Sequence, residues 1–507
     1  MASDGKYLGV CPSRSLETFS ESDVSDTISL VEYLDTVAPL ETVQGDQIRQ
    51  IVIGLLKRIT CEWCYETAIS LGASESLARE TKCALVAFGS YKLGGLIGPS
   101  SDMDLVCICP SILTVDAFFT RLVAKLHEVE SVSEIVPIPT AFTPIIKLKV
   151  NGIDIDLLFS RLAVPRIDMV GDISKIDSDD KFLCGIDQRS ARALNGPRVA
   201  NMILKLVPNL ETFRTTLRAV KFWANRRQIY ANVLGYFGGI AWAICVAKTC
   251  QLYPNYSPSQ LLETFFILIT EPDTFPVKLN QVEMKDQVEF AHFQVWSPDN
   301  PRGGLMPVLT PAFPCQNATD PVTESTKKVI IDECSRAVAI LNPTDMALGV
   351  DTDESPAVAP TYEEKLKNLF SEAVPTNPMI RIEISGATQK VFSRIKGFVE
   401  LKLRSLIYSI EKIDQNNCIA LRPFSDIVDE TASSGTMVIG YTCSSSLVPD
   451  LRPASSSSLV PDLRPAIDRW MRQLAEWNER DEWTGTKYDV KVTAICSDEP
   501  STKRIKV

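Results

Sequence analysis

The sequence predicts a multidomain α+β protein with a small α/β domain, a helical central domain and a C-terminal sandwich of sheet and helices. Three observations lead to this prediction. Strand and helix patterns alternate over residues 84–159, helical spacing dominates residues 192–340, and a strand-helix-strand-strand-helix-strand order occupies residues 379–495. The last order is typical of a ferredoxin-like or RRM-like sheet. A chain of 507 residues has room for about three domains.

Hydrophobic spacing defines the elements of the first two parts. Residues 44–79 are expected to be helical, because Ile51, Leu55 and Ile59 recur at helical spacing. Residues 233–247 form an apolar, glycine-rich run that is too short to span a bilayer, and residues 234–250 are expected to be a buried helix. Further strands are expected at 84–88, 104–109, 144–150 and 153–159, and further helices at 115–129 and 258–270.

The C-terminal part begins after a stretch rich in Asp, Glu, Pro and Thr at residues 342–375, which we expect to be a linker or a divergent loop. A tandem duplication, SSSLVPDLRPAS followed by SSSLVPDLRPAI, occupies residues 444–467 and indicates a lengthened surface loop. The expected strands are 379–384, 418–422, 436–441 and 488–495, and the expected helices are 388–408 and 467–477. The predicted units are 1–40, packed on the central domain, 41–175, 176–345 and 346–507.

Composition narrows the classes of function. The formal net charge is −11, which argues against sequence-independent wrapping of duplex nucleic acid, so RNA contacts must come from local basic patches. Fourteen scattered cysteines fit a reducing compartment. Cys61 and Cys64 form a C-x-x-C with no second pair at zinc-ribbon spacing, so a zinc or redox motif is the weaker interpretation. Neither a signal peptide nor a membrane span is expected.

The chemistry is concentrated in two apolar segments. Asp102-Met103-Asp104 opens one predicted strand, and Asp154-Ile155-Asp156 lies on another that is expected to be its neighbour. Alternate side chains of a strand share a face, so the carboxylates of each segment should point the same way. Such carboxylates repel one another unless cations lie between them. Two Mg²⁺ or Mn²⁺ ions suit these oxygen ligands, and two-metal nucleotidyl transfer is the reaction that this layout favours.

The turn Phe88-Gly89-Ser90 precedes the first carboxylates and complements them. Glycine allows the backbone to approach a triphosphate, and backbone N–H groups and the Ser90 hydroxyl can hold its oxygens. Each element alone is a weak signal, since a single Asp-x-Asp is more often a turn or a solvated strand edge. Their ordered combination on apolar strands favours a nucleotidyltransferase catalytic domain.

A long match in the central region makes the prediction more specific. ArgAlaLeuAsnGly at residues 192–196, TLRAVKFWANRRQIYANVLGYFGGIAWAICVAKTCQLYPN at 216–255 and MPVLTPAFPCQNAT at 306–319 resemble the eukaryotic nuclear poly(A) polymerase family. The resemblance extends from the N-terminal helices to about residue 340 and, more weakly, through the C-terminal sheet. It implies a polynucleotide adenylyltransferase of the nucleus, which adds AMP from ATP to the 3′ end of pre-mRNA and releases pyrophosphate.

The resemblance also implies roles for individual residues. Asp102, Asp104 and Asp156 match the family's catalytic metal ligands, whereas Asp154 matches an acidic position that is not a ligand. The positions that match nucleotide contacts are Phe88, Gly89, Ser90, Asn195, Lys221, Tyr230, Gly238, Gly239 and Ile240. The implied partners are ATP, an RNA 3′ end and cleavage and polyadenylation factors, with no membrane, and the chain is expected to be a monomer.

Two departures from the family pattern remove positive charge near the triphosphate. Residues 98–101 contain Pro99 and no lysine, and Asn225 stands four residues after Lys221 where the family often has a second lysine. Arg226, Arg227 and Lys92 are the possible substitutes. Three alternatives stay open: a poly(A) polymerase, a related uridylyl-transferring or non-nuclear tailing enzyme, and an inactive scaffold that binds RNA or cleavage factors.

Two basic segments are candidates for RNA contact, with a solvated helix face as the equally weighted alternative. Phe142 is a further candidate. The first segment contains Arg214, Arg218, Lys221, Arg226 and Arg227, and the second contains Lys390, Arg394, Lys396, Lys402 and Arg404.

Overall fold

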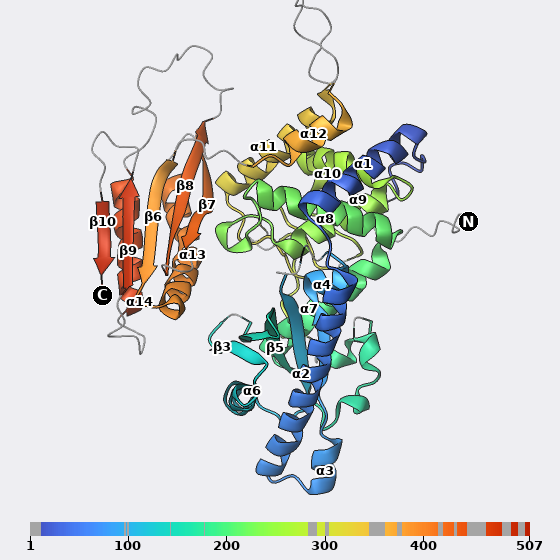
Figure 1. Cartoon of the computed structure of the whole chain (residues 1–507), viewed down its shortest axis with the longest axis vertical. Coiled ribbons are helices and arrows are strands. Elements are labelled where there is room, and N and C mark those ends of the chain that lie inside the picture. Colours follow the sequence, from blue (N-terminus) through green and yellow to red (C-terminus); the bar gives the residue numbers. More distant parts are fainter. Residues whose placement is uncertain are drawn as a thin grey trace, which may run out of the picture.

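A computed structural model of the chain shows three parts (Figure 1). The catalytic α/β part and the C-terminal sheet both adjoin a central group of helices, and the long helix α2 (Val43–Ser70) runs along the catalytic sheet. The structure describes residues 12–95, 98, 101–141, 143–176, 178–281, 290, 292–299, 304–343, 360–372, 378–413, 419–429, 433–443, 463–478, 488–494 and 502–506.

The catalytic part is built on a mixed five-stranded sheet in the order β1-β2-β5-β4-β3. Strands β2 and β5 run parallel, and the other neighbours are antiparallel. Leu56 and Trp63 of α2 share a core with Leu105 of β2, so α2 covers one face of the sheet. The strands are β1 (Ala84–Phe88), β2 (Met103–Cys109), β3 (Val132–Ile138), β4 (Ile145–Val150) and β5 (Ile153–Arg161).

The opposite face of this sheet packs against the central helix α7 (Gln188–Leu206), since Val106 and Ile108 of β2 share a core with Leu194. Because alternate side chains of β2 point to opposite faces of the sheet, this strand contributes to two hydrophobic cores. Asp104 belongs to the same set as Val106 and Ile108, so it faces the central helices.

Two sequence predictions in the catalytic part need correction. Strand β3 was not predicted, because Pro137 and an irregular register between Ser133 and Val136 break its apolar alternation. The helix predicted at 115–129 is interrupted by a π-helical turn. Its pieces are α5 (Val115–Ala117), η1 (Phe118–Leu122) and α6 (Val123–His127), and two short helices, α3 (Glu75–Glu80) and α4 (Gly89–Leu93), flank β1.

The central part consists of helices around a core rich in aromatic side chains. Trp223 and Trp242 meet edge to face with ring centroids 5.8 Å apart. Helix α1 (Glu21–Val37) packs against α8 and α10, and its N-terminus is closed by a capping box at Ser20. The other helices are α8 (Leu210–Arg226), α9 (Gly239–Leu252), α10 (Pro258–Thr270), α11 (Glu324–Leu341) and α12 (Tyr362–Leu369).

The buried helix predicted at 234–250 begins later than expected, at Gly239. Gly235 has φ +92°, a left-handed conformation that ends the preceding 3₁₀ turn. The described 3₁₀ turns are η2 (Ile167–Met169), η3 (Ile173–Lys175), η4 (Asp180–Leu183), η5 (Asn232–Leu234) and η6 (Pro272–Thr274).

Helix α12 lies inside the segment predicted to be a linker, so that prediction is wrong for residues 362–369. Leu366 and Leu369 are fully buried, and the Phe370 ring stacks on Tyr33 of α1 at 5.5 Å. An acidic composition suggested a linker, but two leucines at helical spacing were enough to dock one short helix.

The C-terminal part confirms the ferredoxin-like prediction. Its antiparallel sheet has the order β10-β9-β6-β8-β7, in which β9-β6-β8-β7 follows the βαββαβ pattern and β10 adds an edge. The short, basic β10 was not predicted. The strands are β6 (Pro378–Gly386), β7 (Ile419–Asp429), β8 (Ser434–Cys443), β9 (Tyr488–Ala494) and β10 (Thr502–Lys506), with helices α13 (Gln389–Glu411) and α14 (Arg464–Asn478). Most of the duplicated segment, 444–462, lies outside the described residues.

A buried ionic cluster joins the central and C-terminal parts. Glu333 of α11 accepts from Arg227 Nε at 2.7 Å and from Arg422 Nη1 of β7 at 2.6 Å. Arg422 also donates to the Arg227 carbonyl oxygen. All three residues are less than 9% exposed, so the ion pairs are shielded from water.

Candidate active site

Four side chains form one row across the catalytic sheet. Asp104 of β2 lies opposite Phe88 of β1 on one side and Asp156 of β5 on the other, and Asp156 lies opposite Lys147 of β4. Directly opposed residues of neighbouring strands point to the same face. The prediction that the two acidic segments lie on adjacent strands is therefore confirmed.

Asp102 lies one residue before β2 and is exposed, so the prediction that it is part of the strand is wrong. It nevertheless acts on Asp104 through its charge. Burial, and then the charges of Asp102 and Asp156, raise the pKa of Asp104 from 3.8 to about 7. Lys147 and Lys221 oppose this rise. The three carboxylates thus share an excess of negative charge.

The donor set fits a divalent cation in its chemistry. Three carboxylates supply the oxygen ligands that Mg²⁺ and Mn²⁺ prefer, and the raised pKa of Asp104 shows charge that a cation would relieve. Among the described residues, no three acidic, imidazole or thiol groups converge closely enough to hold a metal as they stand. Asp156 is paired with Lys147 instead, whose Nζ contacts both of its carboxylate oxygens, at 2.7 and 2.8 Å.

Gly89 brings the Gly-Ser turn against Asp104. Its φ is +63°, and a Cβ at this position would overlap the Asp104 carboxylate. Only glycine combines this backbone conformation with so close an approach. The turn predicted from the sequence is thus directly beside the carboxylates.

Lys221 connects the central helices to this turn. From α8, its Nζ donates to Ser90 Oγ at 2.7 Å and to the Gly95 carbonyl at 3.1 Å. Burial lowers the pKa of Lys221, while Asp102 and Asp104 act in the opposite direction. A cation at this point balances part of the carboxylate charge.

Tyr230 and the glycine corner lie on the same side as Lys221. Burial, with Asp102 and Asp104, raises the pKa of Tyr230 to about 12, so the hydroxyl keeps its proton. Gly239 leaves no space for a Cβ beside the Tyr230 hydroxyl, and Gly238 is the N-cap of α9. Ile240 follows in the first turn of α9 and is half-buried.

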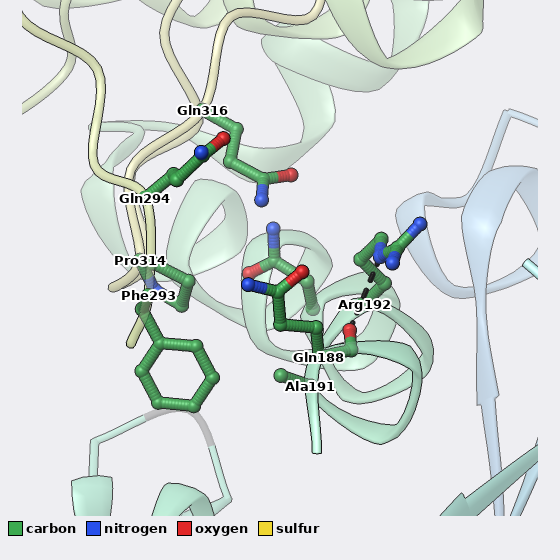
Figure 2. Close-up of a pocket in the computed structure, with 8 residues that line it drawn as sticks. Gln188, Ala191, Arg192, Phe293, Gln294, Pro314 and Gln316 are labelled. Carbon is green, nitrogen blue, oxygen red and sulfur yellow. Dashed lines mark hydrogen bonds between the residues drawn. The ribbon is translucent and has the colours of Figure 1, made fainter. Parts of the chain in front are cut away.

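Asn195 belongs to α7 and lines a neighbouring pocket of about 140 Å³. Figure 2 shows Gln188 of the same helix across the pocket from Gln294 and Gln316, whereas the Arg192 guanidinium points away from these two residues. Asn195 Oδ1 is buried and finds no hydrogen-bond partner among the described residues. The next residue, Gly196, packs so closely on Phe88 that a Cβ would lie 2.6 Å from its ring. The turn, α7 and the pocket are therefore contiguous.

The first basic segment is not a free basic face. Arg218 donates to Asp35 and to the Ala38 carbonyl, and Arg214 donates to the Leu93 carbonyl. Arg226 and Arg227 reach towards α11 and the end of α12, so neither replaces the missing lysine in this arrangement. Lys92 is exposed.

The second departure from the family pattern has a local explanation. Asn225 Nδ2 donates to the Lys221 carbonyl at 2.8 Å, so this side chain is tied to its own helix.

Pro99 and Phe142 lie outside the described residues, as does the side chain of Lys390. In the second basic segment, Lys396 pairs with Glu400 and Lys402 lies over the Phe398 ring.

Lys147 is the residue of this site that sequence reasoning missed. A signal was present, because Lys147 and Lys149 interrupt an otherwise apolar strand and alternate with Ile146 and Leu148. Lys149 pairs with Glu134 and Asp154, one row further along the sheet. Only the strand register shows that Lys147 rather than Lys149 faces a predicted metal ligand.

The sheet, the row of carboxylates and the adjoining Gly-Ser turn have the layout of a nucleotidyltransferase domain. Residues 9–207 match the poly(A) polymerase nucleotidyltransferase domain, and residues 212–348 match the poly(A) polymerase central domain. The chain belongs to the poly(A) polymerase family.

Individual relatives agree with this assignment. The chain is 33% identical over 431 residues to nuclear poly(A) polymerase 4 of Arabidopsis thaliana, with 84% of this chain and 55% of that protein covered. It is 35% identical over 425 residues to nuclear poly(A) polymerase 1 of the same plant, with 81% and 55% covered. The chain thus spans about half the length of these relatives.

Solved structures show a more distant likeness. One of a cytoplasmic RNA terminal U-transferase is 16% identical, with a TM-score of 0.44 over 70% of this chain and 99% of that one.

Within the described residues, no helix is long and apolar enough to cross a membrane.

Proposed function

We propose that this chain is a template-independent poly(A) polymerase, which transfers AMP from ATP to the 3′ end of pre-mRNA and releases pyrophosphate. The observation that carries the proposal is the row formed by Phe88, Asp104 and Asp156, with Gly89 pressed against the Asp104 carboxylate. Opposed carboxylates beside a turn that admits no side chain suit a reaction between a triphosphate and a hydroxyl.

In this proposal, Asp102, Asp104 and Asp156 hold two divalent ions, Mg²⁺ or Mn²⁺. When bound, such ions activate the attacking hydroxyl and stabilise the leaving pyrophosphate. The raised pKa of Asp104 and the exposed position of Asp102 support this role, because the carboxylates lack enough nearby positive charge of their own. Asp156 must leave Lys147 to serve as a ligand.

The nucleotide would lie between the catalytic sheet and the central helices. Ser90 and the Gly89 backbone hold phosphate oxygens, Lys221 adds a positive charge to them, and Tyr230 donates from its protonated hydroxyl. The unpartnered Asn195 Oδ1 accepts from a ribose hydroxyl beside Phe88. Gly238, Gly239 and Ile240 present a flat surface to the adenine.

The wider setting is part of the same proposal. The relatives that match over most of this chain are named nuclear poly(A) polymerases, which supports a nuclear enzyme working with cleavage and polyadenylation factors. The C-terminal sheet is the proposed RNA-binding part, and the active species is proposed to be a monomer. Closure of the domains would align the RNA 3′-hydroxyl with the α-phosphate.

An extension assay tests this function. The purified chain, an oligoadenylate primer and either Mg²⁺ or Mn²⁺ should give a ladder with ATP and little product with UTP, CTP or GTP. Asp104→Ala should abolish extension and leave primer binding mostly intact, whereas Asp154→Ala, one row away, should extend normally.

The outcomes separate the alternatives. Preferential incorporation of UTP would identify a uridylyl-transferring enzyme instead. Primer binding without metal-dependent extension by the wild type would identify a scaffold and contradict the proposal.

A further inference from the structure

Five cysteine thiols meet in the catalytic part, away from the carboxylates. Cys61 and Cys64 lie one helical turn apart on α2, Cys83 immediately precedes β1, and Cys107 and Cys109 lie on β2. The Sγ atoms of Cys107 and Cys109 are 3.6 Å apart. All five are free thiols, and Cys64, Cys107 and Cys109 belong to the core between α2 and the sheet.

Cys83 is the centre of this thiol cluster. It packs against the core that contains Cys64, Cys107 and Cys109, and it lies near enough to Cys61 to change the pKa of that thiol. Access to solvent differs sharply within the group, since Cys61 is exposed and Cys83 is half-buried, whereas the other three are buried. A dissolved oxidant can therefore reach Cys61 first. Among the other four thiols of the cluster, Cys83 is the most accessible.

We propose that Cys61 and Cys83 form a peroxide-sensitive thiol pair that closes into a reversible disulfide between α2 and the start of β1. The Cys61 thiolate attacks hydrogen peroxide, which breaks the O–O bond and yields a sulfenic acid and hydroxide, and the proton that Cys61 released on ionising converts this hydroxide to one water. The Cys83 sulfur then attacks the Cys61 sulfur and displaces the hydroxyl as a second water. Two thiols and one peroxide thus give one disulfide and two waters.

The geometry favours Cys83 over Cys64 as the partner. Side chains three positions apart on a continuous helix keep their Cβ atoms about 5–6 Å apart. A disulfide requires a Cβ separation of about 3.5–4.5 Å, so a bond between Cys61 and Cys64 would distort α2. Cys83 does not belong to α2 and immediately precedes β1, so it can approach Cys61 without distorting a helix.

Electrostatics agrees with this order of events. The hydrogen bond from Cys83 lowers the pKa of Cys61, and the charge of Lys82 acts in the same direction. The thiolate is the form that reacts with peroxide. Hydrogen bonds with Cys107, Cys61 and Cys64 raise the pKa of Cys83, so this thiol keeps its proton and can donate it to Cys61.

The thiol cluster is separated from the proposed reaction site in two ways. Cys107 and Cys109 point to the α2 face of β2, whereas Asp104 points to the opposite face. Ala84, next to Cys83, pairs with Ile108, while Phe88 pairs with Asp104 at the other end of β1. Oxidation can therefore be measured independently of polymerase activity, and the inference does not depend on the proposed function.

The test is peptide mapping of the whole chain after peroxide treatment. Wild-type protein is exposed to hydrogen peroxide, blocked with an alkylating reagent and digested without reduction. We expect a peptide pair joined through Cys61 and Cys83, which disappears on treatment with dithiothreitol. Cys61→Ser should remove it, whereas Cys184→Ser, at another half-buried thiol, should leave it unchanged.

A second variant identifies the intermediate. In Cys83→Ser the sulfenic acid on Cys61 has lost its partner, so dimedone should label Cys61 more strongly than in the wild type. A Cys61–Cys64 bond, equal dimedone labelling in both proteins, or thiols that react only after a chelator removes bound zinc would each overturn the proposal.

Discussion

Lys147 Nζ lies 2.7 Å and 2.8 Å from the two carboxylate oxygens of Asp156, across the β4–β5 ladder. Lys147 is half-exposed and Asp156 is one-fifth exposed, so the pair lies at the edge of the site. Here the lysine supplies the positive charge that a divalent cation would otherwise bring to Asp156.

Removing Lys147 should strengthen metal binding in the absence of nucleotide. An ion pair at this exposure stabilises by about 1 kcal/mol at most, so Lys147→Met should tighten Mn²⁺ binding by up to about fivefold. Electron paramagnetic resonance of free Mn²⁺ measures this directly. Lys149→Met is the matched control, because Lys149 pairs with Glu134 and Asp154 instead. Equal affinity in the wild type and Lys147→Met would contradict the competition.

Asp104 should make the metal-free protein less stable as the pH rises. Its pKa is raised from 3.8 to about 7 in the folded chain, so its favourable contribution is complete below 3.8 and is lost as the pH rises through about 7. Above pH 7, Asp104→Asn should raise the Tm of the metal-free protein by about 5 °C.

The same measurement includes its own controls. Below pH 3.8, Asp104→Asn and the wild type should melt together, since the wild-type carboxyl is then protonated. Added Mg²⁺ should raise the Tm of the wild type at neutral pH more than that of the variant. A constant difference in Tm at every pH would show that charge repulsion is not the cause.

Lys221 should be needed for use of the nucleotide. It is a buried cation that contacts Ser90 and the Gly95 carbonyl, so Lys221→Met removes positive charge beside the turn. We expect kcat/KM for ATP to fall by about 100-fold, in line with the loss of one charge-stabilising group. Arg214→Met, on the same helix but bonded to the Leu93 carbonyl, should lower it far less. Equal losses in the two variants would assign Lys221 a structural role.

Glu333 should hold the C-terminal part on the central helices. It lies buried between Arg227 and Arg422 and also accepts from Arg336, so Glu333→Gln leaves three guanidinium groups without this counter-charge. Breaking a buried pair of this kind costs about 3 kcal/mol, which should appear as a lower urea midpoint. Glu363→Gln removes an exposed pair with Lys367 and should leave the midpoint unchanged. If both variants unfold alike, the buried cluster does not join the two parts.

Much of the fold could be predicted from local patterns. The strand predicted at 84–88 is β1, and the βαββαβ order of the C-terminal part was predicted correctly from the pattern of apolar residues. The failures have physical causes. A bulge and Pro137 concealed β3, a π-helical turn divided the helix after Val115, and docking by Leu366 and Leu369 made a helix in an acidic linker.

Spacing on apolar segments identified the types of chemical group, namely the carboxylates of Asp102, Asp104, Asp154 and Asp156 and the Gly89-Ser90 turn, and the family resemblance then singled out Asp156 rather than Asp154. Tertiary structure alone decided their neighbours. Strand register set Lys147 against Asp156, and helix packing brought Lys221 to Ser90 over a separation of 131 positions. Spacing along the chain specifies which side chains share a face, whereas contact between distant segments depends on how whole elements pack.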